Sequence, residues 1–207
     1  MKRRSSKKQS WADHYARKAQ KDNYPARSVY KLQEIQKKTG VLHKGDRVLD
    51  LGCAPGSWLL YAAELVGPEG SVTGIDKKPV STRLPANVTV RTGDIIDFEK
   101  GWLQNPAGRI TVVLSDMAPD TTGSKWADAA RSHELAVQAL SVAEIALSPG
   151  GNFACKIFQG DDFKSFVDRV KNNFERHIIF KPESCRRESR EIYVIGLNKK
   201  ESKDVGS

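Results

Sequence analysis

The sequence predicts an α/β fold with a seven-stranded, mostly parallel sheet and helices on both faces. Short apolar runs rich in Val and Ile alternate with stretches that show the period of an amphipathic helix. A glycine turn follows the first apolar run, as in Rossmann-like nucleotide-binding sheets. The last two runs are joined only by residues 181–190, a connection too short for a crossover helix, so they are expected to form an antiparallel hairpin.

The expected strands are short and apolar, and most are bounded by Gly, Pro or Asp. They are residues 47–51, 71–75, 88–92, 109–115, 152–158, 177–180 and 191–197. The first is apolar except for Arg47 and Asp50, as expected for a strand buried on both faces. The fourth is β-branched and apolar, which favours a central position in the sheet.

The expected helices carry apolar residues at intervals of three and four. They are residues 11–20 (one or two turns), 27–38, 57–65, 98–105, 128–147 and 162–173. Ser57 is expected to cap the third helix directly after the glycine turn. The fifth helix is expected to stop at Pro149, and the loop at 120–127 before it has the length and composition of a substrate-contacting loop.

Polar residues at the ends of the first three strands indicate the kind of ligand. Gly52 and Gly56 follow the first strand, without the third glycine of the dinucleotide fingerprint G-x-G-x-x-G. Asp76 ends the second strand, where a carboxylate can accept both hydroxyls of a ribose, and Asp94 follows the third, in position to meet an adenine edge. This set suits S-adenosylmethionine, which has no phosphate to bind. The alternative is that both aspartates only cap the segments that follow them.

Composition favours one soluble domain in a reducing, cytoplasmic setting. At 207 residues and 39% hydrophobic content, the chain is long enough for one core and short for two. We expect a basic arm at 1–10, one domain at 11–198 and a flexible tail at 199–207. No apolar run has membrane-spanning length. The three cysteines follow no zinc-ligand spacing and the four histidines are scattered, so no metal is expected.

Positive charge is concentrated at the N-terminus. Residues 1–31 contain ten Lys or Arg against two Asp, a net charge of +8 out of +9 for the whole chain. A solvated tail that aids solubility is one explanation. The aromatic residues interleaved with these charges (Trp11, Tyr15, Tyr24 and Tyr30) favour nucleic acid as the partner, because aromatic faces can stack on bases.

Four charged residues are expected to meet at one edge of the sheet: Lys31, Asp116, Lys156 and Glu191. Lys156 is the most informative, because a lysine inside an apolar strand must be paired or lie beside a pocket. Each residue also has an ordinary explanation. Lys156 can reach water along its stem, and Asp116 can cap a strand end. Lys31 can be a surface lysine of its helix, and Glu191 can pair with Arg187 or Arg190.

Five stretches, in order, resemble motifs of the FtsJ-type ribose 2′-O-methyltransferases. They are residues 25–32 (PARSVYKL), 50–58 (DLGCAPGSW), 115–119 (SDMAP), 156–160 (KIFQG) and 189–193 (SREIY). The resemblance covers about residues 11–197, and Cys53 and Ser57 stand where that family often has Ala and Gly. Within the family, the chain is most similar to the short bacterial and archaeal enzymes that methylate a uridine ribose in large-subunit ribosomal RNA.

The resemblance implies a catalytic tetrad, a cofactor and a partner. The tetrad is Lys31, Asp116, Lys156 and Glu191. S-adenosylmethionine is expected to be held by Gly56, Trp58, Asp76, Asp94 and Asp116. The expected partner is ribosomal RNA within the large subunit, approached through the N-terminal cations and Arg186, Arg187 and Arg190, and the enzyme is expected to be a monomer.

The proposed chemistry leaves the state of Lys156 open. A ribose hydroxyl is a weak nucleophile that must lose its proton, and Lys156 is the expected base. Burial, the sulfonium and Lys31 favour the neutral amine, whereas Asp116 and Glu191 favour the ammonium, which would instead orient the hydroxyl and stabilise developing negative charge. Rival functions are methylation of a transfer RNA or a messenger cap, ribosome assembly without catalysis, and nicotinamide-dependent oxidation, which the glycine spacing disfavours.

Overall fold

The computed structural model describes residues 14–95, 110–186 and 188–201. Seven strands form one sheet in the order β3-β2-β1-β4-β5-β7-β6. The strands are β1 (Arg47–Leu51), β2 (Ser71–Asp76), β3 (Val88–Thr92), β4 (Ile110–Ser115), β5 (Leu147–Phe158), β6 (Phe174–Phe180) and β7 (Glu191–Lys199). β7 lies between β5 and β6 and is antiparallel to both, and the remaining pairs are parallel. The predicted fold class, including the antiparallel last hairpin, is confirmed.

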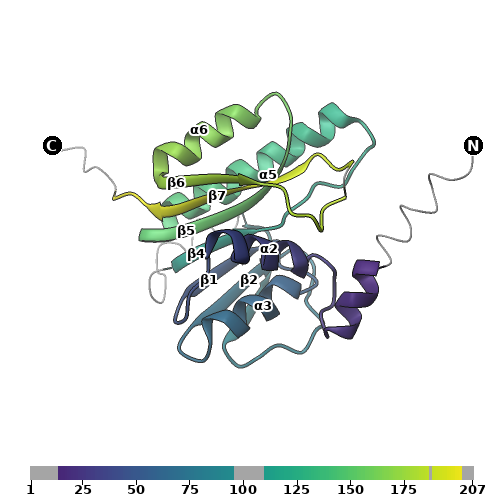
Figure 1. Cartoon of the computed structure of the whole chain (residues 1–207), viewed down its shortest axis with the longest axis vertical. Coiled ribbons are helices and arrows are strands. Elements are labelled where there is room, and N and C mark those ends of the chain that lie inside the picture. Colours follow the sequence, from purple (N-terminus) through teal and green to yellow (C-terminus); the bar gives the residue numbers. More distant parts are fainter. Residues whose placement is uncertain (1–13, 96–109, 187, 202–207) are drawn as a thin grey trace, which may run out of the picture.

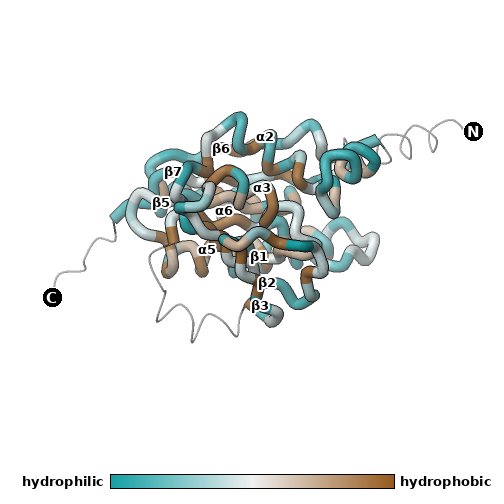
Figure 2. Tube along the Cα trace, turned by 90° about the horizontal axis from the view of Figure 1, so that it is seen from below, coloured by the Kyte–Doolittle hydropathy of each residue, from teal (hydrophilic) through white to brown (hydrophobic). Residues whose placement is uncertain are grey.

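Helices cover both faces of the sheet (Figure 1). On one face lie α2 (Val29–Thr39) and α3 (Ser57–Val66), and on the other lie α5 (Lys125–Ala146) and α6 (Phe163–Asn173). Each face has its own apolar core, because parallel strands buried on both sides present apolar side chains both ways. Figure 2 shows the hydrophobic parts of the trace gathered at the strands, with the helical segment 14–21 hydrophilic and peripheral. The helix expected at 98–105 falls outside the described residues.

β6 begins at Phe174 rather than 177, and three other local predictions about element starts were also wrong. Ser57 does not cap α3: Gly56 occupies the cap position, and the Ser57 hydroxyl instead accepts from the Ala26 amide at 2.8 Å and donates to the Ala26 carbonyl at 3.0 Å. α5 begins at Lys125 rather than 128, because Ser124 caps it by accepting from the Ala127 amide.

The third concerns β5, which begins at Leu147 rather than Asn152. Leu147 already pairs with Ile110 of β4, and the ladder then shifts before Val112 pairs with Asn152. The residues between form an irregularity in which Gly150 has φ 79°, a left-handed conformation that glycine adopts without strain. The helix therefore ends at Ala146, before the expected stop at Pro149, and Pro149 lies within β5.

The topology fixes where a ligand can bind. The chain order reverses between β1 and β4, which are neighbours in the sheet, and in open α/β sheets ligands bind outside the carboxyl ends of the strands at such a point. The glycine turn follows β1 and Asp116 follows β4, so both lie at this point.

All three cysteines are buried and none forms a disulfide. No helix in the described ranges is long and apolar enough to cross a membrane.

Candidate active site

The glycine turn brings backbone close to the end of β4. Gly52 has φ 76°, and a Cβ placed there would lie 2.5 Å from Cγ of Met117. Gly56 has φ 109° and leads directly into α3. A side chain at either position would strain the backbone, and at Gly52 it would also displace the SDMAP segment. The first amides of α3 lack intrahelical acceptors, so the turn presents donors at the edge of the sheet.

Asp76 supports this turn from the end of β2. Its Oδ2 accepts from the Ala54 amide at 2.8 Å, and its Oδ1 accepts from the Lys78 amide at 2.7 Å. The capping explanation considered for Asp76 therefore describes part of what the residue does. Each carboxylate oxygen has two lone pairs, so these bonds leave acceptor capacity for a ribose hydroxyl. Asp94 also lies near this edge, where its Oδ2 is 2.6 Å from Nζ of Lys77.

Asp50 is a feature of this edge that the sequence analysis did not select. It is only 1% exposed, and neither of its carboxylate oxygens has a hydrogen-bond partner in the described part of the protein. Burial, followed by the negative charges of Asp116 and Asp76, raises the pKa of Asp50 well above its usual value. The sequence signal was present, because an acid inside an apolar strand is as unusual as the lysine at 156.

Trp58 lies in a different environment from the carboxylates. Its indole is 3% exposed, its Nε1 donates to the Ser28 carbonyl at 2.9 Å, and its ring lies 6.0 Å from that of Tyr193. The side chain therefore joins α3 to the start of α2 and to β7. Because the indole is enclosed, contact with a cofactor would fall to its backbone amide in the first turn of α3.

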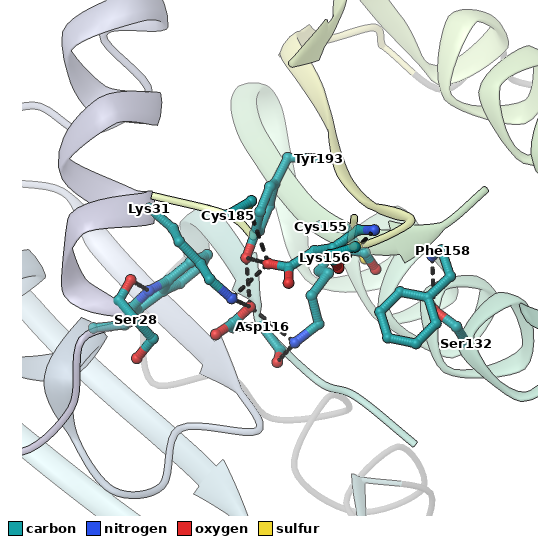
Figure 3. Close-up of polar contacts among 12 residues, drawn as sticks. Ser28, Lys31, Asp116, Ser132, Cys155, Lys156, Phe158, Cys185 and Tyr193 are labelled. Atoms are coloured by element: carbon teal, nitrogen blue, oxygen red, sulfur yellow. Dashed lines mark hydrogen bonds and ion pairs between the residues drawn. The ribbon is translucent and has the colours of Figure 1, made fainter. Parts of the chain in front are cut away.

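The four charged residues expected at one edge do converge, and Figure 3 shows Lys31, Asp116 and Lys156 among them. Nζ of Lys156 donates to Oδ1 of Asp116 at 2.9 Å and also to the Asp116 carbonyl. Nζ of Lys31 lies 2.5 Å from Oε1 of Glu191 and 3.8 Å from Oδ1 of Asp116. Lys31 and Lys156 are 9% and 5% exposed, so neither is a surface lysine. Glu191 pairs with Lys31, while Arg190 donates to the Lys125 carbonyl. Arg187 lies outside the described residues.

Tyr193 connects the two carboxylates and was missed in the sequence. Its hydroxyl lies 2.6 Å from Oδ1 of Asp116 and 2.9 Å from Oε1 of Glu191. A phenol has one hydrogen, so it donates to one carboxylate at a time. Burial, followed by these two negative charges, raises the pKa of Tyr193 well above its ordinary value, which keeps the phenol protonated. Its position two residues after Glu191 on a strand, and so on the same face, was the available signal.

The network shifts the pKa values of Asp116 and Lys31 toward their ionised forms. Burial raises the pKa of Asp116, but the two ammonium groups of Lys156 and Lys31 outweigh it, so the net shift is downward. Burial lowers the pKa of Lys31, but the attraction of Asp116 and Glu191 prevails and the net shift is upward. The ionised forms of Asp116 and Lys31 are therefore both favoured, although the two side chains are largely buried.

Comparison with known sequences identifies the family. The profile of the FtsJ-like methyltransferases matches residues 24–199, and the chain belongs to this family. The prediction of an S-adenosylmethionine-dependent methyltransferase fold is confirmed at this level.

Curated relatives share most of the sequence. The chain is 58% identical over 207 residues to a protein of Desulfosudis oleivorans, covering all of both chains, and 58% identical over 198 residues to one of Desulforapulum autotrophicum, covering 96% and 98%. Both relatives are named ribosomal RNA large subunit methyltransferase E.

Solved structures share the fold. A ribosomal RNA methyltransferase, described as putative, from Plasmodium falciparum matches with a TM-score of 0.73 at 30% identity, covering 85% of this chain and 98% of that one. Fibrillarin of Aeropyrum pernix, solved with S-adenosylmethionine bound, matches with a TM-score of 0.60 at 17% identity, covering 82% and 76%, which shows the fold alone. In the described ranges, no group of three or more His, Cys, Asp or Glu side chains is arranged to hold a metal ion.

Proposed function

We propose that this protein transfers a methyl group from S-adenosylmethionine to the 2′-hydroxyl of a uridine ribose in large-subunit ribosomal RNA. Family membership and the names of the relatives support ribosomal RNA methylation. The ribose as acceptor is favoured by the motif resemblance and by the site. The single observation that carries the proposal is Lys156, a buried lysine at the end of a central strand that is hydrogen-bonded to Asp116.

The residues at the ends of β1 and β2 fit S-adenosylmethionine. The glycine turn lies at this edge with Gly52 packed against Met117 and Gly56 against Val80, and Asp76 keeps acceptor capacity for ribose hydroxyls. The unpartnered Asp50 carboxylate lies at the same edge, where a cationic amino group would compensate its charge. When bound, S-adenosylmethionine supplies an electrophilic methyl group on a sulfonium.

Lys156 is proposed to act on the ribose hydroxyl. Two of its three tetrahedral positions on Nζ are directed to Asp116, one to the side chain and one to the carbonyl. The third position is a lone pair in the neutral amine and a hydrogen in the ammonium. In the first state Lys156 takes the hydroxyl proton as the oxygen forms its bond to the methyl carbon. In the second it donates to the developing negative charge on that oxygen.

Asp116, Lys31, Glu191 and Tyr193 are proposed to position Lys156 rather than to react. Asp116 fixes its direction, and the Lys31–Glu191 pair with the Tyr193 hydroxyl fixes Asp116 in turn. A preorganised arrangement of this kind lowers the cost of aligning oxygen, methyl carbon and sulfur.

RNA is proposed to approach across the basic N-terminal face. His14, Arg17, Lys18 and Lys21 line one shallow hollow on the helical segment 14–21. This segment is attached to α2, because Nζ of Lys18 lies 4.4 Å from the centre of the Tyr30 ring. Fixed cations beside the site can contact several phosphates at once.

The test is methyl transfer from labelled S-adenosylmethionine to large ribosomal subunits, naked ribosomal RNA and transfer RNA, with the labelled atom mapped to base or ribose. Label on a uridine ribose of the large-subunit RNA is the expected result. Label on transfer RNA alone, or on a base, would overturn the proposed substrate. Cofactor binding without label in any RNA would favour an assembly role.

A further inference from the structure

A cavity of about 240 Å³ lies between the first turns of α5, the end of β5 and the start of α6. Its walls include Trp126 and His133 of α5, Phe158 of β5, Phe163 of α6, and the cations Lys125 and Arg190. Pockets that bury a drug-sized ligand span roughly 300–1,000 Å³. This smaller space, in which four of the eleven lining residues carry an aromatic ring, suits a single planar ring system.

Trp126 is the most exposed large apolar side chain in the described ranges, with 73% of its surface in contact with solvent. Its backbone is nevertheless held in place. Arg190 Nη1 donates to the Lys125 carbonyl at 3.0 Å, and the Asp128 carboxylate accepts from the amide and the hydroxyl of Thr122 at 2.8 and 2.9 Å. A large aromatic face presented to solvent on a fixed helix end is typical of a stacking surface.

The cavity is adjacent to the proposed site of methyl transfer. Phe158 follows Lys156 by two residues on β5, so both side chains lie on the same face about 7 Å apart along the strand. Figure 3 shows Phe158 next to Lys156, on the side of Ser132 of α5, whose hydroxyl accepts from the Phe158 amide at 2.9 Å. A nucleotide whose ribose reaches Lys156 therefore brings a base within reach of this cavity.

The charges around the cavity favour one orientation of the nucleotide, with its phosphate on one side of the cavity. Lys125 and Arg190 supply positive charge on the α5 side, while Asp161 and Asp162 supply negative charge at the α6 side. A phosphodiester is attracted by the first pair and repelled by the second. The backbone of the RNA is then expected to follow Lys125 and Arg190, with the base directed between Trp126 and Phe158.

We propose that this cavity binds one unpaired base of the RNA strand that carries the target ribose, with Trp126 as its stacking platform. The inference rests on the proposed function and adds a requirement that the bound RNA be single-stranded at this point. Aromatic stacking tolerates any base, because every base has a π-face, so the cavity contributes affinity and alignment rather than sequence selection.

The test compares Trp126→Ala, Trp126→Phe and Ile145→Ala in the full-length protein. Ile145 is the matched control, because it is also an exposed apolar residue of α5, at the opposite end of the helix. Dissociation constants are measured for a twelve-nucleotide oligouridine and for an abasic ribose-phosphate oligomer of the same length. We expect Trp126→Ala to weaken oligouridine binding by about 10- to 100-fold. Trp126→Phe should restore most of it, and Ile145→Ala should change nothing.

Binding of the abasic oligomer decides whether a base is the occupant. The proposal requires wild-type protein and Trp126→Ala to bind the abasic oligomer equally. Equal loss on both oligomers, or no loss on either, would overturn it. If Trp126→Ala slowed methylation of assembled subunits but not of naked ribosomal RNA, a subunit protein would be the occupant and the proposal would be wrong. Methyl transfer by the wild-type protein tests the proposed function separately. A failure of base binding in the cavity can therefore be distinguished from a failure of the proposed function.

Discussion

The two halves of the sheet edge differ in whether their charged side chains have partners within the protein. On the half formed by β1 and β2, Asp50 is buried with no hydrogen-bond partner among the described residues, and Asp76 supports the turn while keeping acceptor capacity for a ligand. On the half formed by β4, β5 and β7, the two lysines and two carboxylates satisfy one another. The carboxylates of the first half can still accept hydrogen bonds and a positive charge from a ligand. The charged side chains of the second half are already paired with one another. A substitution on the first half should therefore change binding, and one on the second should change rate.

The largest expected effect is on the self-paired half. Lys156→Ala should lower the rate of methyl transfer by about 10²- to 10⁴-fold, the range for loss of a general acid–base group. Its dissociation constant for S-adenosylmethionine should stay within about twofold of the wild-type value, because the lost side chain belongs to the other half. Single-turnover kinetics and calorimetric titration measure the two quantities.

Two further variants serve as controls for the Lys156→Ala experiment. Lys156→Met keeps most of the side-chain volume, so it separates loss of the amine from loss of packing. Lys171→Ala, at an exposed lysine of α6, is the matched surface control. A Lys156→Met enzyme with near-wild-type turnover would remove Lys156 from the mechanism.

The next largest effect is expected on the ligand-dependent half. Asp76→Ala should weaken S-adenosylmethionine binding by about 10- to 100-fold, since hydrogen bonds to a charged group contribute about 1.5–3 kcal/mol. Turnover at saturating cofactor should change little. Titration calorimetry and saturation kinetics separate the two effects. If Asp76→Ala lowered the melting temperature but left cofactor affinity intact, the residue would only support the turn.

Asp50 allows the same half to be tested without cofactor. Because the pKa of Asp50 is raised in the folded protein, the folded state binds the extra proton above pH 4, so stability falls as pH rises toward neutrality. Asp50→Asn removes that titration. At pH 7, without S-adenosylmethionine, the variant should be more stable than the wild type, because it does not bury a carboxylate charge without a partner.

Urea unfolding from pH 4 to 7 measures this difference. The wild-type free energy of unfolding should decline more steeply with pH than that of Asp50→Asn, while Asp168→Asn, at an exposed acid of α6, should follow the wild type. Parallel curves for Asp50→Asn and wild type would mean that the Asp50 carboxylate is not buried as a costly charge.

Local patterns in the sequence were enough to predict the sheet. The strands and most of the helices lie within a few residues of the apolar runs that predicted them. The hairpin was predicted from the short connection between its strands. The start of α5 was missed although its cap, Ser124, is local, whereas two other errors depended on distant contacts. The partner of the Ser57 hydroxyl is Ala26, 31 residues away, and β5 starts early because Leu147 reaches Ile110. No local pattern contains that information.

The candidate site was predictable to a similar degree. A charge in an apolar strand or at a strand end was enough to select Lys156 and Asp116, whose convergence the structure describes. The same criterion was not applied to Asp50. Tyr193 was missed for a different reason: an aromatic residue in a strand is ordinary, and its place two residues after Glu191 is a weak signal compared with the position of its hydroxyl between two carboxylates in the structure.

The smallest expected effect concerns neither half but the approach of RNA to both. Deleting residues 1–10 removes five of the Lys and Arg residues. Each phosphate contact on a single strand contributes about 0.7 to the slope of log affinity against log salt, so the slope should fall by up to about 3.5. Near physiological salt, where charges are screened over about 8 Å, we expect only a several-fold loss of affinity for ribosomal RNA and none for S-adenosylmethionine. A variant with these five residues changed to Gln keeps the length and removes the charge, and it should match the deletion. An unchanged salt slope in both variants would mean that residues 1–10 do not contact RNA and only aid solubility. The RNA would then have to be bound by the lysines and arginines of the folded part of the protein.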